Sequence, residues 1–345
     1  MIGTVIGLSV LVLLGGLYCL HMQGKQASSE KEGDHEKIQT EVEEKEQSEP
    51  SEGETEEVAS PEIIATGTDL TEPALQTDPE WEAVEKEEEV QSEQAYEESV
   101  DLSGLETAIC TEIETRAARW SVVVVNLSNQ QTLVCDNAGT SSTKTTAASL
   151  IKLYIMAAAY DRINAGLLTD TDALEQSIYN MITVSSNEAT NAVLRAIGDG
   201  DSTLGMQRVN AYCQAQGYTA TQVNRLLGIS NYSIENFTSA VDCSRILTAI
   251  YSGSCVSSQW SKKMLSLLRQ QTVTYKIPAG ISNQPVVTIG NKTGELPGLA
   301  EHDVAIITGE GFQYVLCVLC ENSGQDDGAI GEISHISAMV YEAFS

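Results

Sequence analysis

The segment TAASLIKLYIMAAAYDRI, residues 145–162, predicts a helix that runs into the protein core and carries an unusual pair of polar residues. Ser149 and Lys152 stand three residues apart, so on a helix they share one face. Nearly all of their neighbours are apolar, which favours burial. Burial lowers the pKa of an amine, and a neutral amine beside a hydroxyl is a base beside a nucleophile. The segment therefore indicates a candidate catalytic pair.

The same S-x-x-K spacing also arises by chance in this chain. It occurs three times, at residues 28–31, 141–144 and 149–152. The first lies in a charged polar tract and the second in the polar run GTSSTKTT, and only the third opens an apolar helix. A lysine in a core helix can also extend its amine to solvent. The S-x-x-K spacing alone therefore leaves a structural lysine as the alternative.

The net charge of −30 over 345 residues is concentrated in one segment. Residues 27–100 hold 26 of the 49 acidic residues and four of the 19 basic ones. Their few aromatic residues cannot bury enough apolar surface to offset the entropy of ordering, so we expect an acidic disordered tether. The acidity and the absence of a basic patch also exclude nucleic acid as a partner.

Residues 2–20 form a stretch without charged residues that is long enough to span a bilayer. No basic residue precedes it and no A-x-A cleavage site follows it, in contrast to a cleaved signal peptide. We therefore expect residues 1–26 to be a single-pass anchor in the cell membrane, with the catalytic domain, residues 101–345, outside the cell. Secretion after cleavage of a signal segment is the alternative.

The pattern of residues 101–345 predicts strands at both ends and helices in the middle. The expected elements are a helix at 101–117, a β-hairpin at 119–137, helices almost throughout 172–265, β-rich runs at 284–294, 303–311 and 313–322, and a helix at 331–345. The predicted fold class is α/β, with one antiparallel β-sheet flanked by helices plus an inserted all-α lobe. A groove between sheet and lobe is the expected site.

The eight cysteines and four histidines give no metal-site spacing. Cys317 and Cys320 have C-x-x-C spacing, but they lie in a strand-like run, where residues three apart point to opposite faces. We therefore expect neither a metal nor a cofactor. Some disulfides are plausible outside the cell, and free cysteines acting as small buried apolar residues are the alternative.

Two further short motifs follow the S-x-x-K segment. Residues 185–187, Ser-Ser-Asn, are the single S-x-N of the chain and precede a helix. Either serine could instead be only the N-cap of that helix. Residues 292–294, Lys-Thr-Gly, end a β-rich run. There a cation and bare glycine backbone can lie beside a ligand carboxylate, although an ordinary strand end would look the same.

Together, S-x-x-K, S-x-N and K-T-G stand in the order typical of the penicillin-recognising serine enzymes. The region from about 102 to 344 resembles the class A β-lactamases and their penicillin-binding and DD-peptidase relatives. The segments that carry the resemblance are AASLIKLYIM, MITVSSNEATN and GNKTGELPGLAEHDVAIIT. The expected order of strands and helices agrees with this family.

The resemblance implies a catalytic role for three residues. Ser149 would be the nucleophile that is acylated. Lys152 would accept its proton, directly or through water, an assignment that is disputed in the family. Ser185 would relay a proton to the leaving nitrogen.

The resemblance also implies the substrate-binding residues. Asn187 would bind the amide side chain of the substrate, while Lys292 and Thr293, next to Gly294, would hold its carboxylate. The backbone N–H groups of Ser149 and Glu295 would form the oxyanion hole.

The sequence departs from the family in the loop that carries R-W-E-x-x-L-N, whose glutamate activates the deacylating water. The matching stretch is NRLLGISNYSIENFTSA. If Arg225 and Asn231 align with the ends of that motif, Leu227 stands where the glutamate should be, and leucine cannot activate water. The next carboxylate is Glu235. In addition, Ser186 replaces the aspartate of S-D-N, which usually supports the loop.

Three interpretations stay open from the sequence. The first is a β-lactamase-like serine hydrolase with slow deacylation. The second is a penicillin-binding protein or DD-peptidase that acts on D-Ala-D-Ala peptidoglycan stem peptides. The third is a domain that binds cell-wall fragments without turnover. In each case we expect a monomer with a small-molecule β-lactam or a stem peptide as its partner.

Overall fold

The computed structural model describes residues 100, 102–230, 232–281 and 286–345. All of them belong to the second of two compact units, residues 75–345. The expected membrane anchor and all but the last residue of the expected tether lie outside the described residues. None of the described helices is both long and apolar enough to cross a membrane.

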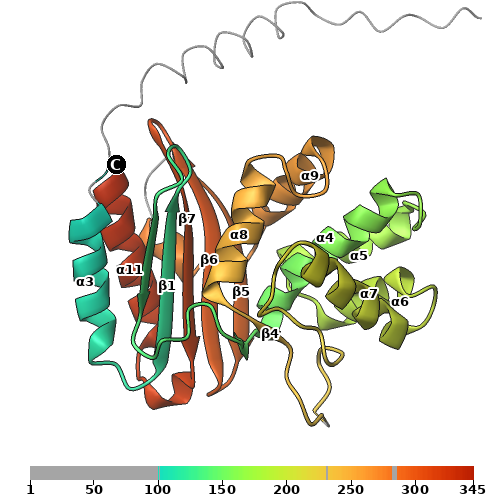
Figure 1. Ribbon diagram of the computed structural model, residues 1–345, viewed down its shortest axis with the longest axis horizontal. Coiled ribbons are helices and arrows are strands. Elements are labelled where there is room, and N and C mark those ends of the chain that lie inside the picture. Colours follow the sequence, from blue (N-terminus) through green and yellow to red (C-terminus); the bar gives the residue numbers. More distant parts are fainter. Residues whose placement is uncertain (1–99, 101, 231, 282–285) are drawn as a thin grey trace, which may run out of the picture. The chain divides into compact units, whose positions relative to one another are not determined.

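The centre of the domain is a five-stranded antiparallel sheet with the order β2-β1-β7-β6-β5. Its strands come from both ends of the domain, as the sequence predicts, and β1 and β2 form the expected hairpin (Figure 1). The strands are β1 Arg119–Asn126, β2 Thr132–Asp136, β5 Thr288–Leu296, β6 Ala300–Gly309 and β7 Phe312–Glu321.

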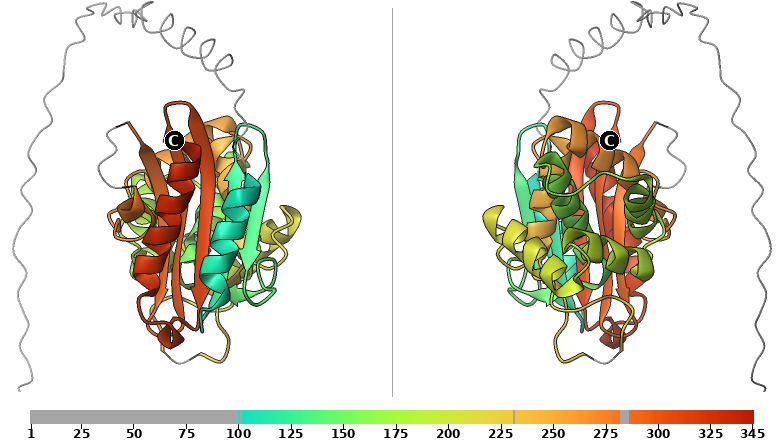
Figure 2. Two further views of the ribbon diagram at one scale, coloured as in Figure 1. Left: turned by 90° about the vertical axis from the view of Figure 1, so that its left-hand side faces the viewer. Right: turned by 90° about the vertical axis from the view of Figure 1, so that its right-hand side faces the viewer.

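Helices cover both faces of this sheet. The terminal helices α3, Leu102–Glu114, and α11, Ala329–Phe344, lie side by side on one face, and α8, Ala240–Tyr251, packs on the other (Figures 1 and 2). Val122 and Val124 join the core beneath the terminal helices, whereas Val123 and Val125 join the core of the α8 face. Because successive side chains of a strand point to opposite faces, the run of valines in β1 is buried on both sides.

The remaining helices form the inserted α lobe and its connection back to the sheet. Side-chain oxygens of Thr171, Ser186, Asp201 and Ser257 cap the starts of four of them, which satisfies otherwise unpaired N–H groups. The helices are α4 Ile151–Asn164, α5 Asp172–Thr183, α6 Asn187–Ile197, α7 Ser202–Ala215, α9 Ser258–Leu268 and the short α10 Ile277–Gly280.

The structure corrects the prediction of one helix over residues 145–162. Thr145–Thr146 forms strand β3, which pairs with β4, Phe237–Thr238. A 3₁₀ turn, η1, follows at Ala148–Leu150, and α4 begins only at Ile151. The two β-branched threonines favour extended backbone. Their strand partner, β4, lies about ninety positions further along the chain. A local sequence pattern cannot reveal a pairing over that distance.

The prediction of helices almost throughout residues 172–265 is wrong for the segment between α7 and α8. Gly217, with φ of +74°, follows the end of α7, and β4 is the only regular element before α8 among the described residues. The Asp242 carboxylate accepts a hydrogen bond from Ala220 N, and Asn236 Oδ1 accepts from Asn224 N. In this segment, hydrogen bonds to side chains therefore take the place of the backbone hydrogen bonds of a helix.

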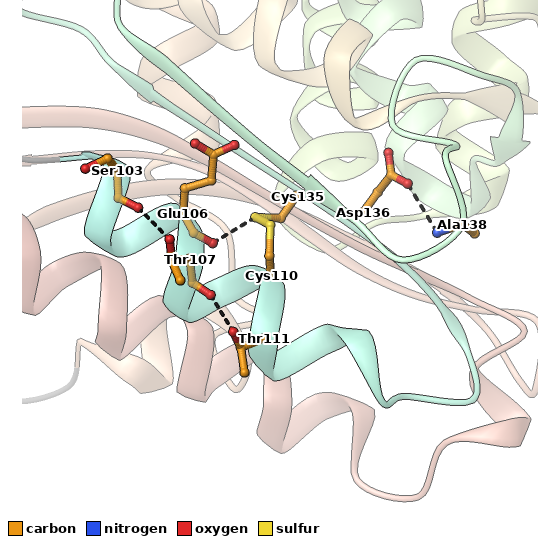
Figure 3. The surroundings of a disulfide bond; sticks show 8 residues. All are labelled: Ser103, Glu106, Thr107, Cys110, Thr111, Cys135, Asp136 and Ala138. Carbon is orange, nitrogen blue, oxygen red and sulfur yellow. Dashed lines mark hydrogen bonds between the residues drawn. A yellow bond between two sulfur atoms is a disulfide. The ribbon is translucent and has the colours of Figure 1, made fainter.

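One disulfide joins Cys110 of α3 to Cys135 of β2 (Figure 3). The sequence left this pairing open. The Sγ atom of Cys135 also lies 3.2 Å from the carbonyl oxygen of Glu106. Of the cysteines that the structure describes, the other five are unpaired and buried, in accordance with their apolar surroundings: Cys213, Cys243, Cys255, Cys317 and Cys320.

Candidate active site

The turn that presents Ser149 is strained and held from several sides. Ala148, directly before Ser149, has φ of +45°, a conformation that costs free energy for a residue with a Cβ. The N–H of Ala147 donates to the carbonyl oxygen of Asn236 at 2.8 Å. A Cβ atom on Gly294 would lie 3.1 Å from the carbonyl oxygen of Ala147, so the glycine lets strand β5 approach the turn closely.

His302 supports the same turn from the sheet, a role that no sequence motif indicates. Its Nε2 lies 2.8 Å from the carbonyl oxygen of Thr146, and its Nδ1 lies 3.1 Å from the N–H of Cys320. The carbonyl can only accept and the amide can only donate, so the neutral ring carries its proton on Nε2. Burial lowers the pKa of His302 to about 4, which keeps this arrangement intact at neutral pH.

Lys152 lies at the start of α4, and its side chain is fully buried. Its Nζ lies 3.0 Å from Ser149 Oγ, 2.6 Å from the carbonyl oxygen of Ser185, 3.0 Å from Ser185 Oγ and 3.0 Å from Asn187 Oδ1. The structure thus brings together Ser149, Lys152, Ser185 and Asn187. The alternative of a lysine that extends to solvent is wrong.

The protonation state of Lys152 follows from its surroundings. Burial, and to a smaller extent the positive charge of Lys292, lowers the pKa of Lys152 to about 6, so the neutral amine dominates at pH 7. A neutral amine has two N–H groups and one lone pair. The carbonyl oxygen of Ser185 and Asn187 Oδ1 can only accept, so they take the two N–H groups. The lone pair is then free to accept the proton of Ser149 Oγ.

Ser185 lies between the two lysines of the site. Its φ of +55° is a second left-handed conformation in a residue with a Cβ. Its Oγ lies 3.0 Å from Lys152 Nζ and 2.9 Å from Lys292 Nζ. Ser186, not Ser185, caps α6 by accepting from the N–H of Ala189. Ser185 is therefore free of a capping role and can carry a proton between the lysines and a bound ligand.

Lys292 comes from β5, which is one of the two edge strands of this five-stranded sheet. Its side chain is fully buried, and Nζ also donates to the carbonyl oxygen of Thr293 at 2.9 Å. Burial lowers the pKa of Lys292 to about 7, and the positive Lys276 acts in the same direction, whereas Asp303 and Glu295 oppose it. At neutral pH a large share of Lys292 is therefore cationic, and an incoming carboxylate would raise that share.

A pocket of about 50 Å³ opens directly at the nucleophile, between sheet and lobe as expected from the sequence. Among the described residues that line it, Glu295 is the only carboxylate. The lining residues are Ala148, Ser149, Asn187, Arg225, Leu227, Gly228, Asn236, Glu295 and Leu296.

The loop after α7 places Leu227, not a carboxylate, in this pocket. Its side chain is buried, and the amide of Asn191 binds both of its backbone groups: Oδ1 accepts from Leu227 N at 3.0 Å and Nδ2 donates to Leu227 O at 2.9 Å. Gly228, with φ of +77°, turns the chain beside Asn187. The position is thus fixed by the lobe, but it carries no group able to activate water.

Glu235, the other candidate for water activation, is bound to Arg225. Glu235 Oε2 lies 2.9 Å from both Nε and Nη2 of that arginine, and it does not line the pocket. Asn231, the expected end of the loop motif, lies outside the described residues. The structure therefore assigns Glu235 to holding the loop together.

Sequence reasoning missed three residues that position the site: His302, Asn191 and Asn236. Each acts through backbone groups of another segment, and a single buried polar side chain has no local signature. The catalytic and binding roles of Ser149, Lys152, Ser185, Asn187, Lys292, Thr293, Gly294 and Glu295 stay predictions, now with the geometry described above. Among the described residues, no three His, Cys, Asp or Glu side chains gather as metal ligands.

Comparisons with known proteins bear on the family and the fold of this chain. A family model described as "Beta-lactamase enzyme family" matches residues 104–177 and 171–344, which together cover most of the chain. A search of the curated proteins found no match.

Three solved structures with the same fold are distant from this chain in sequence. A beta-lactamase from Sphaerobacter thermophilus DSM 20745 is 23% identical, with a TM-score of 0.61 over 71% of this chain and 98% of that chain. PBP-A is 23% identical, with a TM-score of 0.60 over 70% of this chain and 96% of that chain. A leucine-to-glutamate variant of PBP-A, solved as an acyl-enzyme complex with penicillin G, gives the same identity and TM-score over 70% of this chain and 97% of that chain. At these identities the likeness shows the fold.

Proposed function

Because the chain belongs to the beta-lactamase enzyme family and is a β-lactamase-like serine hydrolase, we propose that β-lactams acylate it at Ser149 and that the acyl group is released slowly. The observation that supports slow release of the acyl group is the position of Leu227. It lines the pocket at Ser149, at the place where the family resemblance puts a water-activating glutamate.

Acylation begins with Ser149 Oγ attacking the carbonyl carbon of the donor. The lone pair of Lys152 Nζ, 3.0 Å away, accepts the hydroxyl proton as the new C–O bond forms. The negative charge on the carbonyl oxygen is stabilised by the backbone N–H groups of Ser149 and Glu295. Removing one such donor typically costs about 3 kcal/mol of transition-state stabilisation.

The proton then moves from Lys152 to the leaving nitrogen through Ser185. Its Oγ lies 3.0 Å from Lys152 Nζ, so it can accept from the lysine while it donates to the leaving group. Lys292, 2.9 Å from the same Oγ, keeps the positive charge of the site near the donor carboxylate throughout. Collapse of the tetrahedral intermediate breaks the C–N bond and leaves an ester on Ser149.

Deacylation needs a water molecule that loses a proton as it attacks this ester. General-base assistance of such a step is typically worth about 10²- to 10⁴-fold in rate. Leu227 cannot accept a proton, and Glu235 is paired with Arg225. Lys152 is the base that directly contacts Ser149 Oγ.

The chemistry of the leaving group favours stem peptides over β-lactams as turned-over substrates. When a β-lactam ring opens, the leaving amine stays attached to the acyl group and shields the ester from water. When a D-Ala-D-Ala peptide is cleaved, the terminal D-alanine diffuses away and opens a path for water. We therefore assign peptides that end in D-Ala-D-Ala as the substrate class, with β-lactams as long-lived acylating agents.

The test is covalent labelling of the full chain with a fluorescent penicillin, together with an assay for D-alanine release from an acyl-D-Ala-D-Ala peptide. We expect one label per chain that is lost in Ser149→Ala, and release of D-alanine by the unmodified protein that penicillin blocks. Absence of both labelling and release, or labelling that persists in Ser149→Ala, would contradict the proposal.

We further propose that the domain works outside the cell on a single-pass anchor. The charge-free residues 2–20, the acidic spacer and the Cys110–Cys135 disulfide support this, because disulfides persist in oxidising compartments. Protease added to intact cells should remove the domain, whereas a domain protected until lysis would contradict the topology. We also propose that the protein is a monomer, which sedimentation measures directly.

A further inference from the structure

A chain of hydrogen bonds between buried side chains links α4, β4, the loop after α7 and α8. It begins at Tyr154 of α4, whose OH lies 2.8 Å from Oγ1 of Thr238 on β4. Thr238 Oγ1 lies 3.0 Å from Oγ1 of Thr221 in the loop. Thr221 Oγ1 lies 2.8 Å from Asp242 Oδ2, which also accepts from the N–H of Ala220 at 2.9 Å. All four side chains are buried, and the catalytic steps proposed above use none of them.

The carboxylate at one end fixes the direction of every hydrogen bond in this chain. Asp242 accepts, so the Thr221 hydroxyl gives its single proton to Asp242 and has to accept from Thr238. The Thr238 hydroxyl then has to accept from Tyr154 OH. Burial raises the pKa of the Tyr154 phenol, so its proton is available to donate. Cys243 Sγ, 3.6 Å from Tyr154 OH, is a weaker acceptor than the Thr238 hydroxyl.

Asp242 connects this chain of hydrogen bonds to the central sheet. It lies in the first turn of α8, the helix that packs on the sheet face opposite the terminal helices. Its N–H donates to Oγ of Ser239, the N-cap of α8, at 3.0 Å. The start of α8 is therefore well defined, and the chain of hydrogen bonds has a fixed end.

Strand β4 transmits this support to the turn of the nucleophile. β3 and β4 form a ribbon of two residue pairs, Thr145 opposite Thr238 and Thr146 opposite Phe237. Such a two-stranded ribbon is at best marginally stable by itself. β3 leads into the strained turn at Ala148, a conformation that persists only where surrounding groups hold it. The ribbon therefore needs the side-chain hydrogen bonds of Thr238.

Tyr154 joins the same ribbon to the helix that carries the base. It stands two residues after Lys152 on α4, whereas Ser149 lies in the turn before this helix. The hydrogen bond from Tyr154 to Thr238 thus connects the helix of the base with the strand pair that leads into the nucleophile turn. His302 holds the sheet side of that turn, so the turn is held from two directions.

We infer that Thr238 is a positioning residue for acylation: its hydrogen bond with Tyr154 keeps Ser149 Oγ at the distance from the base that proton transfer requires. Asp242 orients this hydrogen bond through the intervening hydroxyl. The inference rests on the proposed acylation of Ser149. Because Thr238 acts through the backbone of β4 and β3, its loss should slow the chemical step and not weaken binding of the donor.

The test measures how fast penicillin G acylates the full chain at increasing concentrations of the drug. This separates the rate constant at saturation from the apparent dissociation constant. Thr238→Val keeps the shape of the side chain without its hydroxyl, and Tyr154→Phe removes the other partner. Each should lower the saturating rate by about tenfold, because a misplacement of 1 Å can cost about 100-fold. The dissociation constant should not change, since Lys292 and Thr293 are assigned to hold the donor.

Two further variants test the path of the hydrogen bonds. Thr238→Ser keeps a hydroxyl and should restore most of the rate that Thr238→Val loses. Thr221→Val cuts the path to Asp242 and should slow acylation by a smaller factor than Thr238→Val. The double variant of Tyr154→Phe with Thr238→Val should be no slower than either single variant, because both remove the same hydrogen bond.

Tyr160→Phe is the matched control. Tyr160 lies on the same helix and is buried, but its OH donates to Glu175 Oε2 of α5 at 3.2 Å and not to β4. The control removes an equivalent hydroxyl and should leave both constants unchanged. Thermal melts establish that each variant compared is folded.

Three results would overturn the inference. The first is an unchanged saturating rate in folded Thr238→Val and Tyr154→Phe. The second is equal slowing in Tyr160→Phe, and the third is slowing by Thr238→Ser as large as by Thr238→Val. If Thr238→Val does not fold, Tyr154→Phe and Tyr160→Phe decide the question. An unmodified chain that penicillin G does not acylate would instead refute the proposed function.

Discussion

Replacing Leu227 by glutamate should convert slow release of penicillin into turnover. The amide of Asn191 binds both the N–H and the carbonyl oxygen of Leu227. The backbone should therefore keep its position when the side chain is replaced. Leu227 shares the pocket with Ser149 and Asn187, so a carboxylate there can reach a water molecule next to the Ser149 ester. The variant supplies a carboxylate as general base at a position where the natural chain has leucine.

The size of the effect follows from the two changes that the substitution makes. A positioned general base typically accelerates a proton transfer about 10²- to 10⁴-fold, so the lifetime of the acyl-enzyme should fall by at least about 100-fold. Leu227 is only 6% exposed, and losing its apolar burial should lower the free energy of unfolding by about 2 kcal/mol. The folded protein should therefore survive with a lower Tm.

The assay follows the decay of the penicillin adduct by mass after excess drug is removed, and the consumption of penicillin in parallel. Leu227→Gln is the control, because glutamine has the shape of glutamate and no basic group. An adduct on a folded Leu227→Glu variant that decays as slowly as in the natural chain would refute the reasoning. Equal acceleration in Leu227→Gln would also refute it, since space for water and not a base would then limit deacylation.

Three further predictions concern the titrating groups and the disulfide. Acylation by penicillin should rise with pH through about 6 as Lys152 becomes neutral and fall through about 7 as Lys292 loses its proton, giving a narrow bell that a stopped-flow pH profile resolves. His302 has a pKa of about 4 when folded and 6.5 when unfolded, so the unfolded state binds more protons between these values. Stability should therefore be complete above pH 6.5 and fall by up to about 3 kcal/mol as the pH drops to 4, and His302→Gln should flatten this part of a denaturant-melt series. Reduction of Cys110–Cys135, which closes a loop with a sequence separation of 25, should cost about 3 kcal/mol in the same melts, and no change in Tm would contradict that contribution.

Much of the fold was predictable because its signals are local. The valines of β1, the apolar run of α4 and the serine and threonine caps each show in a few consecutive residues. The order of the three short motifs then placed Ser149, Lys152, Ser185 and the 292–294 segment in one groove. The structure adds the distances and the lowered pKa of Lys152, which follow from burial on all sides.

The remainder was not predictable because it depends on pairs that are distant in sequence. The pairing of Thr145–Thr146 with β4 changes the expected helix start into a strained turn. His302 and Asn191 bind backbone groups of other segments, so their amino-acid types alone do not reveal their roles in the site. The ion pairs of Lys276 with Glu295 and Glu301 depend on a strand register that no short window of sequence specifies.

The central claim is that β-lactams acylate Ser149 and that the acyl group is released slowly. The most direct test is intact-mass spectrometry of the full chain mixed with excess penicillin G, followed for hours, with the antibiotic measured in the same samples. The account predicts one stable adduct per chain, located on Ser149 by peptide mapping, with little antibiotic consumed. A fleeting adduct with steady hydrolysis of the penicillin would contradict it and show that another group activates water in this pocket.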